Sequence, residues 1–166
     1  MTEPRISLRA PTEDDRDTFV RLFGDPTFMV FHSHGPMDAD AANARFDRML
    51  RMASELHCSK RPIVERTTGE IIGYAGLDVM EFEGAEWLEL GYRLVVPARG
   101  KGYATEACAT LLAQASVLFS GQVLGVVDPA NTASKHVLDK VGFRRWQRTT
   151  IGGDEVDVFR RELDGW

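Results

Sequence analysis

The sequence contains little cysteine. Only two of its 166 residues are cysteines, Cys58 and Cys108. A secreted domain held together by disulfides would carry more, so the count indicates an intracellular chain with reduced thiols. We expect both thiols to be packed within helices. A disulfide between them stays open at this stage, because pairing depends on a separation that the sequence does not give.

Basic residues are also scarce relative to acidic ones. Lys and Arg number 20 against 25 Asp and Glu, which gives a formal net charge of −5. Nucleic-acid binding rests on basic surface, so we expect no nucleic-acid partner, while a cationic substrate is compatible with the acidic balance. No apolar run approaches a membrane span, and MTEPRISLRAP lacks the apolar core of a signal peptide. We therefore expect a cytoplasmic protein without a membrane partner.

Clusters of metal ligands are missing from the sequence. His32 and His34 could bind a metal, but no Cys, His or Asp cluster with ligand spacing accompanies them. We predict no metal, and interpret this pair as part of a polar loop. His57 and Cys58 are neighbours on a predicted helix and therefore do not face each other, which disfavours a Cys–His nucleophile pair.

The hydrophobic pattern predicts one mixed α/β domain spanning residues 1–166. Helices are expected from Thr12 to the stop at Gly24, at 39–57, from about 103 to 119, and after Asn131, which we expect to be an N-cap. Expected strands cover 5–10, 62–65, 71–80, 87–96, 122–127, 143–151 and 155–163. The apolar run at 122–127 is typical of a buried parallel strand. The order combines an antiparallel meander with helical crossovers.

The stretch ARGKGYATEA, residues 98–107, lies between a strand-like run and an alanine-rich helix. Free N–H groups at a helix start favour an anion, and glycines at 100 and 102 would let the backbone approach a phosphate closely. The stretch lacks the Lys-Ser/Thr ending of a P-loop and does not fit G-x-G-x-x-G. A plain left-handed turn with solvated basic residues fits the stretch equally well when it is taken alone.

Its surroundings favour the anion site. The run from Arg99 to Ala104 resembles the Arg/Gln-x-x-Gly-x-Gly/Ala signature of the GNAT N-acetyltransferases, and the run from Leu90 to Pro97 resembles that family's fourth strand. Asn131-Thr132-Ala133-Ser134 followed by Val141-Gly142-Phe143 is similar to the N-x-x-S…GF segment of the RimJ/RimL branch. The start of the chain, Ile6 to Asp15, also resembles that branch.

The resemblance implies the GNAT fold, a mostly antiparallel sheet splayed between its fourth and fifth strands and flanked by about four helices. It also implies acetyl-CoA as cosubstrate. Strand-like hydrogen bonds to its pantetheine arm would come from Leu94, Val95 and Val96. Its pyrophosphate would rest on the backbone of Arg99, Gly100, Lys101, Gly102, Tyr103 and Ala104. Asn131 would also contact the cofactor. The family's loop between the first two helices borders the acceptor, so we expect Phe31 and His34 to contact substrate.

Two residues are candidates for catalysis. Glu89, near the place of the family's carboxylate, would act as a base through water, although a solvated strand carboxylate beside other glutamates is an equal alternative. Ser134 would donate a proton to the leaving thiolate, its alternative being a first-turn helix hydroxyl. Leu138 stands where many GNAT enzymes have an acidic tyrosine. A RimL-like glutamate on the strand after Phe143 is absent, which disfavours a ribosomal-protein substrate.

The resulting prediction is an N-acetyltransferase that moves acetyl from acetyl-CoA to a primary amine by direct attack in a ternary complex. The acceptor is a protein N-terminus or a small-molecule amine. The alternative is a catalytically inactive acyl-CoA-binding sensor or partner module on the same fold. A plain α/β domain without a cofactor is a third hypothesis. The oligomeric state stays open, with a homodimer among the alternatives.

Overall fold

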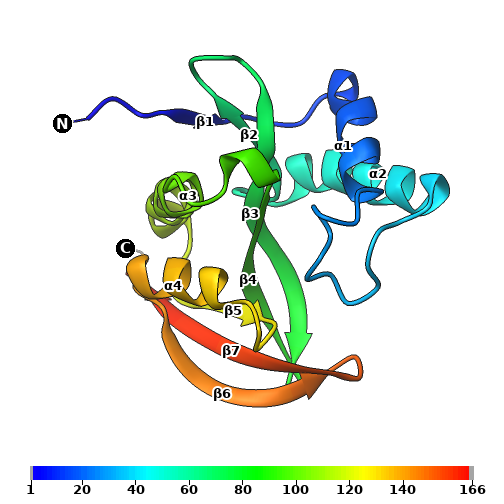
Figure 1. Cartoon of the computed structure of the whole chain (residues 1–166). Coiled ribbons are helices and arrows are strands. Elements are labelled where there is room, and N and C mark those ends of the chain that lie inside the picture. Colours follow the sequence, from blue (N-terminus) through cyan, green and yellow to red (C-terminus); the bar gives the residue numbers. More distant parts are fainter. Residues whose placement is uncertain (1, 165–166) are drawn as a thin grey trace.

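One seven-stranded sheet organises the chain, as a computed structural model describes it for residues 2–164 (Figure 1). The strand order is β1-β2-β3-β4-β5-β7-β6. The strands are β1 (Ile6–Leu8), β2 (Arg61–Glu65), β3 (Ile71–Phe82), β4 (Ala85–Leu94), β5 (Gly121–Val127), β6 (Arg144–Ile151) and β7 (Asp154–Leu163). The helices are α1 (Arg16–Phe23), α2 (Ala39–Glu55), α3 (Tyr103–Leu118) and α4 (Thr132–Lys140), with short 3-10 turns at Glu13–Asp15 and Val96–Ala98.

The pairing of β4 with β5 differs from every other pairing in the sheet. Strands β3 and β4 form a long antiparallel hairpin, in register from Gly73↔Leu94 to Phe82↔Ala85. Strands β4 and β5 are parallel and pair only at Leu88↔Val123 and Glu89↔Leu124. Beyond these pairs the two strands diverge, so the sheet opens in the middle as the resemblance implied.

Helices cover both faces of the sheet (Figure 1). Helices α1 and α2 lie on one side, where their aromatic residues, among them Phe19 and Phe46, pack with Tyr74 of β3. Helices α3 and α4 lie on the other side, over a core that includes Leu111, Val123 and Leu138. The opening between β4 and β5 therefore connects the side of the sheet covered by α1 and α2 with the side covered by α3 and α4.

Most predicted elements are confirmed, with two corrections. The second helix ends at Glu55, so Cys58 lies beyond it in a turn, with φ 61°. Both thiols are buried and free, so no disulfide forms between them. Strand β4 ends at Leu94, because the chain turns into the 3-10 segment with Pro97 at its start, and proline has no N–H for a sheet.

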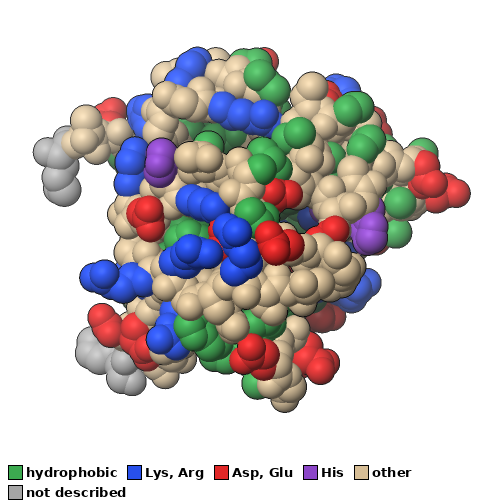
Figure 2. Space-filling view, turned by 60° about the horizontal axis from the view of Figure 1, so that its bottom comes forward, with side chains coloured by type: hydrophobic (Ala, Val, Ile, Leu, Met, Phe, Trp, Pro, Cys, Tyr) green, Lys and Arg blue, Asp and Glu red, His purple; other side chains and the backbone are tan. Residues whose placement is uncertain are grey.

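Charged side chains of both signs share the surface. Figure 2 shows Lys and Arg side chains beside Asp and Glu over the visible face rather than as one continuous basic area. This mixture agrees with the composition. None of the helices described for residues 2–164 has both the length and the apolar character needed to cross a membrane.

Candidate active site

Glu89 lies where the sheet begins to open. It is the last β4 residue paired with β5, opposite Leu124. On the other side it pairs with Asp78 of β3. Its side chain is partly buried and lines a cavity of about 300 Å³, whereas Glu81, Glu83 and Glu86 on the same hairpin are exposed. The structure therefore places Glu89 apart from the solvated glutamates that formed its alternative.

The surroundings of Glu89 favour its protonated form. Burial raises the pKa of its carboxyl, and the nearby negative charge of Asp78 raises it further. Lys60, Arg45 and Arg93 act in the opposite direction without reversing the shift. A general base works best when its pKa is close to the operating pH, so the shift moves Glu89 toward the range that a base needs.

Ser134 faces the same cavity from the first turn of α4. Its Oγ lies 2.8 Å from Oη of Tyr92, which comes from β4, and either hydroxyl can be the donor. Burial raises the pKa of the Tyr92 phenol, while the hydrogen bond to Ser134 partly opposes the shift. Tyr92 therefore keeps its proton throughout the neutral range. Two linked hydroxyls stand at the opening between β4 and β5.

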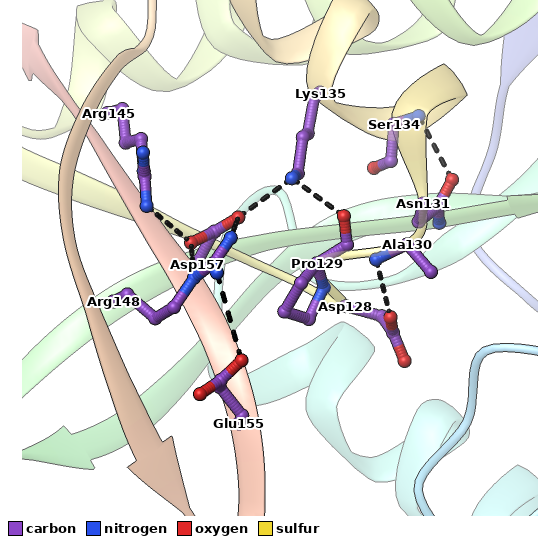
Figure 3. Close-up of polar contacts among 10 residues, drawn as sticks. All are labelled: Asp128, Pro129, Ala130, Asn131, Ser134, Lys135, Arg145, Arg148, Glu155 and Asp157. Atoms are coloured by element: carbon purple, nitrogen blue, oxygen red, sulfur yellow. Dashed lines mark hydrogen bonds and ion pairs between the residues drawn. The ribbon is translucent and has the colours of Figure 1, made fainter.

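Helix α4 is anchored at its N-cap, Asn131, and at Lys135 (Figure 3). The Asn131 side chain accepts a hydrogen bond from the Ser134 N–H at 3.1 Å, which confirms the predicted N-cap. Lys135 forms a 2.8 Å ion pair with the fully buried carboxylate of Asp157 on β7 and donates to the Pro129 carbonyl. Arg145 and Arg148 also form ion pairs with Asp157. These contacts hold the Ser134 hydroxyl in position.

The glycine-rich stretch forms the start of α3. Gly100 and Gly102 have φ of 74° and 83°, and Gly102 is the N-cap. The first hydrogen bond into the helix runs from the Glu106 N–H to the Gly102 carbonyl, so the N–H groups of residues 103–105 have no partner within the helix. Arg5 supports the loop by donating to the Lys101 carbonyl at 2.9 Å. This arrangement suits a phosphate group.

A groove of about 230 Å³ leads from this loop to Ser134. Leu94, Gly100, Ala104 and Asn131 line it, and β4 beyond Glu89 has no β5 partner there. The open strand edge and the loop fit an extended arm with a pyrophosphate at one end, as acetyl-CoA has. The groove and the 300 Å³ cavity share Ser134, Tyr92 and Asn131 in their walls, so the donor path meets the cavity at the two hydroxyls.

Three predicted cofactor residues donate hydrogen bonds within the protein, and a fourth is exposed. The Val95 N–H donates to the Ile72 carbonyl at 2.9 Å, and Val96 is exposed at the start of the 3-10 turn. The Arg99 guanidinium donates to the Leu94 and Thr27 carbonyls. The Tyr103 hydroxyl donates to Glu65 of β2. The predicted cofactor residues that line the groove are Leu94, Arg99, Gly100, Ala104 and Asn131, whereas Val95, Val96, Lys101, Gly102 and Tyr103 do not line it.

The loop between α1 and α2 closes the opposite wall. Phe31, 41% exposed, lines both spaces. His34 is exposed and lines neither, whereas His32 faces the cavity and takes a 3.2 Å hydrogen bond from Arg45 on Nε2. Burial, followed by the charges of Arg45 and Arg93, lowers the pKa of His32 to about 4, so its ring is neutral near pH 7. The structure thus places His32 at the site, and not His34, which was the predicted one.

Sequence reasoning missed the residues that only tertiary structure brings together. Tyr92 lies on the same face of β4 as Leu90 and Leu94, which indicates an inward side chain but does not indicate its partner on α4. Arg45, Lys60 and Arg93 come from three separate segments. Leu138, at the expected tyrosine position, fills the core, and two of its methyl carbons would lie 3.0 Å from a Cβ at Gly125. Within residues 2–164 no three His, Cys, Asp or Glu side chains could hold a metal together.

A sheet opened between two parallel strands, with a glycine-rich anion seat at one side and a carboxylate at the apex, defines an acyl-CoA-dependent acyltransferase. Residues 5–144 match the family described as Acetyltransferase (GNAT) domain. The chain belongs to this family, and as a member it is an acetyltransferase that uses acetyl-CoA.

Individual relatives agree with the family. The chain is 27% identical over 146 residues to the protein named Uncharacterized N-acetyltransferase p20 of Bacillus licheniformis, covering 85% of this chain and 80% of the relative. A putative GnaT-family acetyltransferase from Bordetella pertussis superposes with a TM-score of 0.82 at 19% identity, over 97% and 98% of the two chains. RimL, a ribosomal L7/L12 α-N-protein acetyltransferase solved with coenzyme A, superposes with a TM-score of 0.79 at 14% identity, over 98% and 96%.

Proposed function

We propose that this protein transfers an acetyl group from acetyl-CoA to a primary amine by direct attack in a ternary complex. The amine belongs to a protein N-terminus or to a small molecule, and the protein is a cytoplasmic, single-domain member of the RimJ/RimL-like branch. The observation that carries the proposal is the position of Glu89 at the apex of the opening, in one cavity with the Ser134–Tyr92 pair. A proton acceptor and a proton donor thus line the space where the donor groove ends.

The acceptor amine reaches the cavity from the side of α1 and α2. An ammonium has no lone pair, so it must first lose a proton. Glu89, with its raised pKa, takes that proton through a water molecule. The neutral nitrogen then attacks the thioester carbonyl carbon, and backbone N–H groups of the open β4 edge stabilise the charge that develops on the oxygen.

Collapse of the tetrahedral intermediate breaks the carbon–sulfur bond. The electron pair goes to sulfur, and the departing thiolate takes a proton from the Ser134–Tyr92 pair. The nitrogen gives up its remaining excess proton, and a proton returns through solvent to the pair. We assign Ser134 as the direct donor, and Tyr92, which lines the groove as well, supplies the proton behind it through the 2.8 Å contact. The products are an N-acetyl amine and free CoA.

The residues that would hold acetyl-CoA follow from the groove. Leu94 ends β4 beside the pantetheine arm, Val95 and Val96 follow it into the 3-10 turn, and Asn131 caps the facing helix. The backbone of the loop would receive the pyrophosphate, with residues Arg99, Gly100, Lys101, Gly102, Tyr103 and Ala104. When bound, acetyl-CoA supplies the activated acyl carbon and the thiol leaving group.

The test is release of the CoA thiol from acetyl-CoA against a panel of primary amines, with tertiary amines of similar shape as controls that cannot be acetylated. We expect release only with primary amines, and initial-rate lines that intersect when both substrates are varied. Parallel lines would indicate an acetylated enzyme and contradict direct attack. If acetyl-CoA raises the melting temperature but no amine releases thiol, the chain is instead a binding module.

A further inference from the structure

The cavity around Glu89 carries more positive than negative charge. Arg45 of α2, Lys60 before β2 and Arg93 of β4 line it, against the carboxylates of Glu89 and Asp128. Lys60 forms a 3.7 Å ion pair with Asp78, which also pairs with Arg48, so the unpaired positive charge lies on Arg45 and Arg93. The protein as a whole has a net charge of −5, so this local balance opposes the global one. A cationic acceptor, which the composition alone would permit, meets repulsion here.

Two of these cations converge on one buried atom. Arg93 Nε donates to Tyr74 Oη at 3.1 Å, and Arg45 Nη2 donates to the same oxygen at 3.3 Å. Tyr74 is 3% exposed. Burial acts to raise the pKa of its phenol, but the charges of Lys60, Arg45 and Arg93 outweigh burial and lower it. The cations are therefore close enough together to stabilise a negative charge at this point.

Neither guanidinium has an anionic partner in the part of the chain that the structure describes. No carboxylate of residues 2–164 lies within 4.0 Å of Arg45 or Arg93. Arg16, by contrast, pairs with Glu13 and Asp47 although it is near the surface. Partly buried cations are usually compensated by an anion. Two uncompensated ones facing a cavity point to an anion that arrives with a ligand.

Arg93, one of the two unpaired guanidiniums, and Glu89 lie on the same face of the sheet. Residues 89 and 93 are both on β4, an even number of positions apart, so their Cα atoms are about 13 Å apart and their side chains point the same way. Lys60 lies between them, because a Cβ on Gly91 would be 3.3 Å from its Nζ. A small molecule can therefore present its amine to Glu89 and its other end to the guanidiniums.

We propose that the acceptor amine also carries a carboxylate or a similar oxyanion, which Arg45 and Arg93 bind with Tyr74 between them. The inference rests on the proposed acetyl transfer and adds the chemical class of its acceptor. Guanidinium groups suit this role, because their planar donors match the two oxygens of a carboxylate. An acidic small amine, such as an amino acid, fits better than a polyamine.

The test compares matched acceptors in the thiol-release assay: an α-amino acid and a longer ω-amino acid, each with its own amide, and spermidine. Rates are expressed per concentration of free amine, because amidation also lowers the amine pKa. We expect kcat/KM for at least one amino acid to exceed that of its amide about tenfold or more, as for loss of a charged hydrogen bond, and spermidine to be poorer than either.

Variants locate the effect. Arg93→Gln and Arg45→Gln should lower kcat/KM for the acid about tenfold more than for its amide, so that the preference disappears. Loss of either charge also raises the pKa of Glu89 further, and this change acts on the acid and the amide alike. Arg51→Gln, which removes the same charge from an exposed position of α2, should leave it intact. Arg93→Lys and Arg45→Lys serve if a Gln variant fails to fold, and should reduce the preference only partly.

Each outcome separates the two proposals. Thiol release from amides or spermidine at rates equal to or above those of the acids would overturn the proposed carboxylate site at Arg45 and Arg93, while leaving acetyl transfer in place. An acid preference that survives both Arg variants would overturn the assignment to Arg45 and Arg93. No thiol release with any primary amine would reject the proposed function itself.

Discussion

The Tyr92 phenol on β4 and the Ser134 hydroxyl on α4 lie 2.8 Å apart across the opening of the sheet. Their strand and helix meet at the point where the donor groove and the cavity join. Leu138 occupies the place of the tyrosine in many related enzymes. In the proposed mechanism the Ser134–Tyr92 pair provides the hydroxyl chemistry instead, with Ser134 from the first turn of α4 and Tyr92 from β4.

Removing either hydroxyl should slow collapse of the intermediate. We expect Ser134→Ala to lower kcat by roughly 100-fold or more, in line with loss of a general acid. Tyr92→Phe should have a smaller effect, because it removes only the proton behind Ser134. The check is steady-state kinetics together with the Kd for CoA, which should change little in either variant. Equal activity of Ser134→Ala and the wild type would exclude Ser134 as donor.

Gly102→Val should abolish tight binding of CoA. Gly102 has a φ of 83°, which a β-branched residue adopts only with strain, and the new Cβ would lie 3.3 Å from Arg5 Nη2. We expect a loss of about 1–3 kcal/mol of stability and a large rise in the Kd of CoA measured by calorimetry. Gly69→Val is the matched control, since Gly69 has a φ of 72° in a turn with free space around it. Its strain should leave CoA binding unchanged.

Asp157→Asn should loosen α4. The wild-type carboxylate is fully buried and paired with Lys135, Arg145 and Arg148, so we expect a loss of about 2 kcal/mol in urea unfolding at neutral pH, the scale of a charged hydrogen bond. Hydrogen bonding by Arg148 holds the pKa of Asp157 well below its usual range despite burial. Its contribution is therefore present above about pH 4 and is lost as the pH falls below the unfolded pKa toward the folded one.

The variant provides the control for that pH dependence. The difference in unfolding free energy between wild type and Asp157→Asn should shrink steadily on acidification. A constant difference would show that the charge of Asp157 is not the stabilising feature. A normal kcat in the variant would show that Ser134 does not depend on this anchor.

Local chemistry explains what could be predicted from the sequence. The glycines at 100 and 102, the Asn131 cap and the terminator Gly142 each act within one turn of the backbone, so their residue types indicate their conformations directly. Phe31 and Ser134, the residues predicted to contact substrate and to donate a proton, line both the groove and the cavity. The alternation of apolar residues likewise gave the order of strands along the chain.

The remaining features depend on register and on distance in space. Arg93 reaches Tyr74 because the β3–β4 hairpin pairs these two positions, and Arg45 joins them from a helix that precedes both strands. Nothing in the local sequence indicates such a cluster. His34 was expected at substrate and His32 was not, since only the path of the loop decides which ring turns inward.

The central claim is that Glu89, at the apex between β4 and β5, takes the proton from the acceptor amine. The most direct measurement is the pH dependence of kcat/KM for wild type, Glu89→Gln and the control Glu86→Gln, an exposed position on the same strand. Each is assayed with an ordinary primary amine and with a weakly basic one that is already neutral at the assay pH.

For the ordinary amine, we expect wild-type activity to fall as the pH drops through the raised pKa of Glu89. Glu89→Gln should lose that step and about 100-fold in rate, with much of the loss recovered for the weakly basic amine, while Glu86→Gln should match wild type. An unchanged profile in Glu89→Gln, or an equal loss with both amines, would contradict the account.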